Sequence, residues 1–175
     1  MKKLAIVLLF GSASIAASEL SLPLQLLLEQ PSMNQMLAED RENLVQVNQV
    51  GNHNQAILLQ AGGKGNAIAL TQTGWRNLAD VAQIGNKNQS FVNQKGKNNE
   101  VYIRQEGNEN DLNILQDGDN LLVEYNQFGQ GKSDRVQQKG QGGVFIKNDY
   151  APGNGVRVNT FNQHTTGGTV IVNHY

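Results

Sequence analysis

The side chains that could do covalent or metal chemistry are few in this sequence and do not cluster. There is no Cys, which excludes disulfides, thiolate metal sites and a cysteine nucleophile. The three histidines are widely spaced and do not suggest a metal centre: His53, His164 and His174. Asp149, Tyr150 and Arg157 stand near one another, but no His or Ser accompanies them in a recognisable spacing. The sequence therefore predicts no enzyme, no bound metal and no cofactor.

Amide side chains dominate the polar chemistry instead. The 175 residues include 22 Asn and 19 Gln, and only 38% of the chain is hydrophobic. A globular domain usually carries about 45–50% apolar residues, so the composition argues against a conventional single-core enzyme. With 14 basic against 15 acidic residues, the chain also lacks the basic surface that nucleic-acid binding requires.

The amides are periodic. Nine glutamines recur every eleven residues, with one step of twelve: Gln49, Gln60, Gln72, Gln83, Gln94, Gln105, Gln116, Gln127 and Gln138. A glycine follows two places after each: Gly51, Gly62, Gly74, Gly85, Gly96, Gly107, Gly118, Gly129 and Gly140. An asparagine follows most of them: Asn54, Asn66, Asn77, Asn88, Asn99 and Asn110. The step of twelve is explained by one extra turn residue within 62–65.

The residues before each glutamine alternate between apolar and mixed types. Val45 and Val47 precede Gln49 at positions −4 and −2, and most later copies repeat this pattern. A period of two predicts a half-buried strand with the glutamine on its inward face. Gly and Asn tolerate the left-handed backbone of tight turns, so each eleven-residue unit is expected to be a strand plus a turn. Two units give a rung of about 22 residues, and about six stacked rungs give an all-β, amyloid-like β-solenoid with two parallel sheets.

This stacking accounts for a polar residue in the core. An unsatisfied buried amide costs about 1–3 kcal/mol. Identical glutamines stacked at about 4.8 Å can bond to one another, as in the amide ladders of cross-β fibrils. We expect the asparagines to form a second ladder at the turns.

The period loosens after Gln138. We expect Asn148 to take the next glutamine position after a ten-residue step, followed by a longer loop. Gln163 and His174 are again eleven residues apart, so His174 is expected to act as an interior hydrogen-bonding residue in the last strand. These degenerate repeats carry more basic than acidic residues.

The N-terminus has the order of a secretory signal peptide. Lys2 and Lys3 precede the apolar run LAIVLLF, and small residues follow, which predicts a signal peptide at 1–18 with cleavage between Ala16 and Ser18. The Leu-rich segment 19–42 is either a cap on the first rung or a leader read by a secretion pore.

The pattern Gln-x-Gly-x-x-Asn-x-Ala-x-x-x-Gln resembles the curlin repeat of bacterial curli fibre subunits. Two copies match it in full, from Gln49 through Gly51, Asn54 and Ala56 to Gln60, and the copy from Gln72 to Gln83. The resemblance is firm over 43–140 and loose over the degenerate repeats at 141–175.

The resemblance implies a secreted subunit that crosses an outer-membrane pore, with the help of accessory proteins, and joins other curlin subunits in extracellular amyloid fibres of the biofilm matrix. Such fibres have a major subunit and a minor subunit that nucleates them at the cell surface. The segment 19–42, which is not Gly-rich, and the basic last repeats favour the minor subunit. The ending His174-Tyr175 is closer to the major one.

Two alternatives concern the surface. The charges at the turns are either solvated residues or gatekeepers, in which like charges stacked in one row slow assembly. Trp75 and Arg76 are either a surface turn pair or a ligand-stacking pair, as in a monomeric solenoid that binds a ligand or acts as an adhesin. Ice binding would need a row of outward Thr, which Thr71 and Thr73 do not form.

Overall fold

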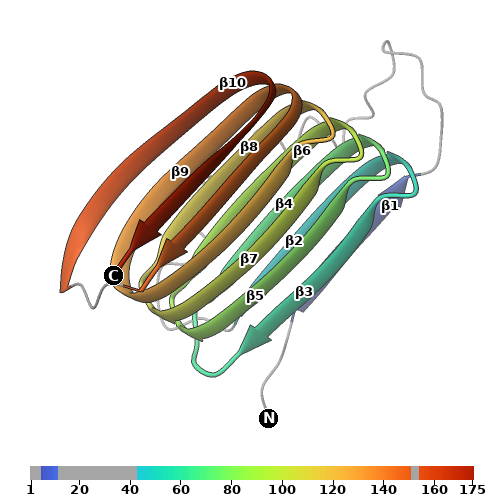
Figure 1. The fold of residues 1–175 in the computed structure, drawn as a ribbon. Coiled ribbons are helices and arrows are strands. Elements are labelled where there is room, and N and C mark those ends of the chain that lie inside the picture. Colours follow the sequence, from blue (N-terminus) through green and yellow to red (C-terminus); the bar gives the residue numbers. More distant parts are fainter. Residues whose placement is uncertain (1–4, 12–42, 151–153) are drawn as a thin grey trace.

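A computed structural model describes residues 5–11, 43–150 and 154–175, and all elements in these ranges are strands (Figure 1). The strands are β1 (Ala5–Gly11), β2 (Leu44–Asn52), β3 (Gln55–Ala61), β4 (Ala67–Trp75), β5 (Leu78–Asn86), β6 (Gln89–Lys97), β7 (Glu100–Asn108), β8 (Asp111–Asp119), β9 (Leu122–Asp149) and β10 (Asn154–His174). The described residues contain no helix long and apolar enough to cross a membrane.

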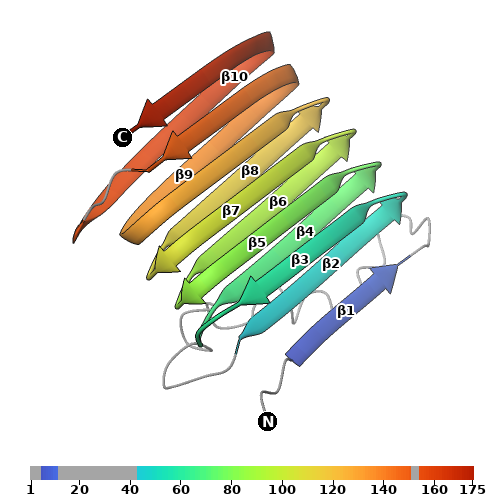
Figure 2. The same ribbon diagram turned by 60° about the horizontal axis from the view of Figure 1, so that its bottom comes forward.

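The chain winds as a parallel β-solenoid of about six turns (Figures 1 and 2). One ladder runs through β1, β2, β4, β6, β8 and the second part of β9, and the other through β3, β5, β7 and the first part of β9. The long strands β9 and β10 each bend around the stack and so contribute to both ladders. Figure 2 shows β1 at one end of the stack and β10 at the other.

The register places equivalent repeat positions above one another. Gln49 pairs with Gln72, and Gln72 pairs with Gln94. The first of these steps is 23 residues and the second is 22, as the extra residue within 62–65 predicts. The last step, from Gln138 to Gln163, is 25 residues. The predicted all-β solenoid with rungs of about 22 residues is therefore confirmed.

The core is thin and lies between the two ladders. Alternate residues of each strand point into it, and the central apolar ones, such as Leu70, Val81 and Ile114, are at most 1% exposed. The interior glutamines share this inward parity and are fully buried. Side chains of the opposite parity face outward, as expected for strands of period two.

Part of the predicted N-terminal organisation lies outside the described residues. This applies to Lys2 and Lys3, to the predicted cleavage region and to the segment 19–42. Within the predicted signal peptide, β1 is described, and it pairs in parallel with β2 from Ala5↔Leu44 to Gly11↔Val50.

Candidate functional site

Two columns of glutamines run along the stack. The first contains Gln49, Gln72, Gln94, Gln116, Gln138 and Gln163, and the second contains Gln60, Gln83, Gln105 and Gln127. Each glutamine except the last of its column donates from Nε2 to Oε1 of the next one, at 2.5–3.1 Å. The same Nε2 also reaches across the core, as from Gln94 to the carbonyl of Leu78 at 2.9 Å. The amides therefore join successive rungs and also join the two ladders.

The asparagines form similar columns at the turns. The backbone N–H of Asn88 donates to Oδ1 of Asn66 at 3.0 Å, and its Nδ2 donates to the carbonyl of Gly107 at 2.8 Å. The other predicted asparagines repeat this arrangement in two columns: Asn54, Asn77 and Asn99 in one, and Asn66, Asn88 and Asn110 in the other. Asn43, which the sequence analysis missed, begins the second column by accepting from Asn66. The sequence could have revealed Asn43 as a member of this column, because it lies six residues before Gln49.

The regular spacing of the repeat glycines has a second cause besides the turn, which is the close approach of neighbouring rungs. All nine have positive φ, from 83° to 150°. A Cβ on Gly96 would lie 1.9 Å from the carbonyl oxygen of Gly118 in the next rung, so no side chain fits. The left-handed residues of the turns themselves are non-glycine residues two places further on, which the sequence did not reveal: His53, Arg76, Lys87, Asn98, Glu109 and Asn120.

The second glutamine column ends differently from the prediction. Asp149, rather than Asn148, follows Gln127 in the column and pairs in register with His174. The step from Gln138 stays at eleven residues because Phe145, Lys147 and Asp149 keep the inward parity. Asn148 instead accepts from the Asn126 side chain at 2.9 Å. Gln127 Nε2 is left buried without a hydrogen-bond partner among the described residues.

Four charged side chains form what we call the C-terminal ionic cluster: Lys132, Asp134, Lys147 and Asp149. Each is at most 3% exposed. Lys132 Nζ lies 2.5 Å from Asp149 Oδ1, and Lys147 Nζ lies 2.5 Å from Asp134 Oδ2 and 3.3 Å from Asp149 Oδ2. Two of the basic residues that distinguish the last repeats, Lys132 and Lys147, are therefore buried, and their charges are balanced inside the core.

The cluster interrupts the repeat pattern and lowers the pKa of Asp149. Lys132 occupies an asparagine position, since its backbone N–H donates to Asn110 Oδ1 at 3.2 Å. Burial alone would raise the pKa of Asp149, but the hydrogen bond from Lys132, the charges of Lys147 and Lys132 and the bond with His174 together lower it below its usual value. His174 pairs in register with Asp149 and lies with Nδ1 3.2 Å from Asp149 Oδ1, but its side chain is 38% exposed rather than interior.

Asp111 shows the opposite effect. It is the first residue of β8 and accepts from Ser133 Oγ at 3.4 Å through Oδ2. Its Oδ1 is buried without a hydrogen-bond partner among the described residues. Desolvation raises the pKa of this carboxyl, and the hydrogen bond from Ser133 only partly offsets the increase.

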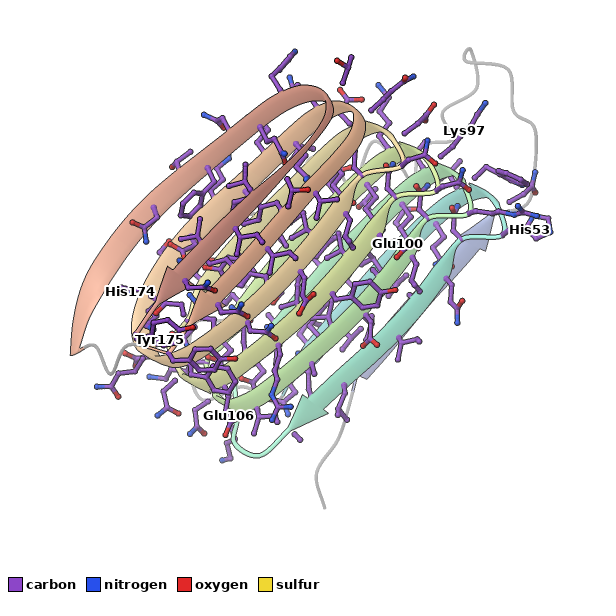
Figure 3. The ribbon with its side chains drawn as sticks, viewed as in Figure 1. His53, Lys97, Glu100, Glu106, His174 and Tyr175 are labelled. Carbon is purple, nitrogen blue, oxygen red and sulfur yellow. The ribbon has the colours of Figure 1, made fainter. Side chains whose placement is uncertain are left out.

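Charges on the outer surface alternate in sign along the stack. Lys95 is in register with Asp117, which is in register with Lys139, and Lys97 is in register with Asp119. At the turns, Lys87 and Glu109 lie 3.4 Å apart. The gatekeeping interpretation required like charges in one row, and the register shows opposite charges instead. Figure 3 shows such side chains at both ends of the rungs, with Lys97 at one end and Glu106 at the other.

Aromatic side chains gather at the two ends of the rungs as well. At one end, the Arg76 guanidinium lies 3.9 Å from the Trp75 ring centre, and Trp75 Nε1 donates to His53 Nδ1 at 3.2 Å. The Trp75 ring is therefore already contacted by its own chain. At the other end, the rings of Phe128, Tyr150 and Tyr175 stack along the axis, at 4.8 Å and 6.1 Å between centres. Within the described ranges, no group of three His, Asp or Glu side chains could hold a metal ion.

The first rung presents an open strand edge. Among the described residues, β3 pairs with β5 on one side and has no strand on the other. Gln60 Oε1 is buried there without a hydrogen-bond partner among these residues. Ile57 and Leu59, on the outer face of β3, are 48% and 55% exposed. The edge thus offers unpaired backbone, an amide acceptor and apolar surface in one place.

Comparison with known proteins agrees with the repeat pattern. The family model described as the curlin associated repeat matches residues 41–74 and 76–107, which include β2 to β7 except for the last residue of β4 and of β7. No curated protein and no solved structure shows significant similarity to the chain. The first half of the solenoid is thus similar to the curlin associated repeat.

Proposed function

We propose that this chain is a secreted structural subunit of curli-type amyloid fibres, which assemble outside the cell and serve biofilm formation and adhesion. Two curlin associated repeats support this proposal, since they occur in structural fibre subunits rather than in enzymes. The observation that carries it is the continuous glutamine column, which would extend unchanged into a second subunit. The partners would be further curlin subunits, with a secretion pore and its accessory proteins on the way out.

The mechanism we propose is templated polymerisation without bond chemistry. Each glutamine column has a direction, because every Nε2 that has a glutamine in the following rung donates to the Oε1 of that glutamine. The first rung accordingly ends in the acceptors of Gln49 and Gln60, and the last rung carries Gln163. A second copy placed end to end would supply donors to the first rung and would bury the edge of β3.

Removal of the signal peptide would enlarge the exposed strand edge to which a second copy could add. The pairing of β1 with β2 covers one half of the first rung. Cleavage after residues 16–18 would detach β1, so that the edges of β2 and β3 would both be free in the exported chain. An open parallel edge is the usual template for addition of further strands.

We further propose the minor, nucleating type of subunit. Its support is the difference between the two ends of the stack. The first rungs follow the repeat and offer apolar residues and glutamines, whereas the last rungs replace them with the C-terminal ionic cluster. A nucleator needs one end that matches the bulk subunit, and its other end is free to differ. The major subunit is the alternative, favoured by the Gln163 and His174 positions that continue the columns.

The test is to block the β3 edge without disturbing the fold. Leu59→Lys adds a charge to an exposed edge position, and Asn93→Lys adds the same charge to an exposed position in the middle of the stack. We expect Leu59→Lys to lengthen the lag of thioflavin fluorescence several-fold and Asn93→Lys to leave it nearly unchanged, since edge charges oppose strand addition. Equal lag times would contradict growth at β3.

Seeding separates the two types of subunit. A nucleator, added at a small molar fraction, should shorten the lag of a major curlin subunit, and assembly without such seeding would indicate a major subunit. A chain that stays monomeric throughout would point to a solenoid that binds a ligand.

A further inference from the structure

We propose that Lys147 and Asp134 become joined by an intramolecular isopeptide bond. This inference does not depend on fibre assembly, because both residues belong to one chain. It rests on the C-terminal ionic cluster, which places a lysine amine, a carboxyl group and a second carboxylate together in a closed core.

The geometry suits attack of the lysine nitrogen on the carboxyl carbon. Lys147 Nζ lies 2.5 Å from Asp134 Oδ2, and the two side chains are 2% and 0% exposed. Both oxygens of Asp134 accept hydrogen bonds, Oδ1 from Asn159 Nδ2 at 2.7 Å and Oδ2 from the Tyr125 hydroxyl. These donors would polarise the carboxyl group and stabilise the negative charge that develops on it during attack.

Asp149 is placed to move the proton. Its Oδ2 lies 3.3 Å from Lys147 Nζ, while its Oδ1 is held by Lys132 at 2.5 Å. A carboxylate within reach of the attacking nitrogen is the arrangement required of a general base. The bond between Asp149 and Lys132 keeps this base oriented without involving Lys132 in the reaction.

The surroundings favour the uncharged partners. Aromatic rings flank the amine, with the centres of Tyr125 and Phe161 each 5.3 Å from Lys147 Nζ. Phe161 in turn packs against the buried Phe145, with 5.2 Å between the ring centres, and pairs in register with the buried Val136. Two opposite charges in such a site carry a large desolvation penalty, and condensation to a neutral amide would remove it.

The reaction balances without any co-reactant. One proton of the Lys147 ammonium group passes to Asp134, which gives an amine and a carboxylic acid. The amine nitrogen then bonds to Cγ of Asp134 and loses a proton to Asp149. The bond from Cγ to one carboxyl oxygen breaks, Asp149 returns the proton to the departing hydroxyl, and one water molecule is released. The amide would link the two sheets across the core in a chain that has no Cys for disulfides.

The test is the intact mass of the folded, purified chain, measured after denaturation. We expect a mass lower than that of the sequence by one water molecule, and a proteolytic fragment in which the peptides carrying Asp134 and Lys147 are linked. The full sequence mass in folded protein would overturn the proposal.

Matched variants show which reaction causes a mass loss of one water molecule. Lys147→Met removes the nucleophile, and the exposed Lys97→Met is the control that should keep the cross-link. Asp117 precedes Gly118 and could also lose water by forming a succinimide, so a loss that persists in Lys147→Met would overturn the proposal. Asp149→Asn leaves the nucleophile in place and should greatly reduce the cross-linked fraction, and an unchanged fraction would contradict the assigned base.

Discussion

Replacing one interior glutamine tests the hydrogen-bonding account of the core. Gln94 is fully buried and takes part in four hydrogen bonds. Gln94→Ala would leave Gln116 Oε1 without its donor and one N–H of Gln72 without its acceptor. Each buried group left unsatisfied costs about 1–3 kcal/mol, so the loss should be about 2–6 kcal/mol in the free energy of unfolding. That is a large share of the total of about 5–15 kcal/mol that is typical for a folded domain.

The assay is urea unfolding of the monomer, followed by circular dichroism at low protein concentration. Asn93→Ala, at the adjacent exposed position, is the control and should change the free energy by less than about 0.5 kcal/mol. Gln94→Leu keeps most of the side-chain volume and should still be strongly destabilising, because the same partners are orphaned. If Gln94→Leu were as stable as the wild type, packing rather than the amide ladder would hold the rungs together.

Other positions give predictions of different kinds. Gly96→Ala should lower the free energy of unfolding by several kcal/mol in the same assay, because its Cβ would overlap a carbonyl of the next rung. Gly142→Ala is the control and should cost much less, because its Cβ would meet no atom closer than 3.6 Å. Equal losses would refute the close-approach argument. Asp149→Asn should destabilise the fold at pH 7, because the lowered pKa of Asp149 means that its ionised form stabilises the folded state. This stabilisation is fully present above the unfolded pKa of about 3.9 and is lost as the pH falls through the lower pKa of the folded state. Asp111→Asn should stabilise at pH 7, because a raised pKa means that the ionised acid opposes folding, and a shift of the same sign as Asp149→Asn would contradict this.

Most of the architecture could be predicted from the sequence because it depends on repetition. Positions such as Gln72 and Gln94 recur at a fixed step, and alternation of apolar residues sets the inward face, so rung length and strand direction follow. The stacking of Gln and Asn could also be predicted, since a buried amide in one rung can form a hydrogen bond with the equivalent amide in the next rung.

The last rungs could not be predicted in the same way, because they depart from the repeat. Lys147 and Asp149 are charged, and charged residues usually lie on the surface, so their residue types alone do not indicate burial. Only the continued eleven-residue step reveals that both keep the inward parity. Their burial depends on mutual pairing with Asp134 and Lys132, which are distant in the repeat pattern. A pairwise interaction of this kind leaves no periodic signal.

The most direct test of the central claim is thioflavin fluorescence against time for the purified chain without residues 1–18, with and without fragments of its own preformed fibres. The account predicts spontaneous fibres, a lag that the fragments remove, and a fibre diffraction repeat of about 4.8 Å along the axis, as expected for stacked strands. A chain that folds into its solenoid but stays monomeric at every concentration, seeded or not, would contradict it.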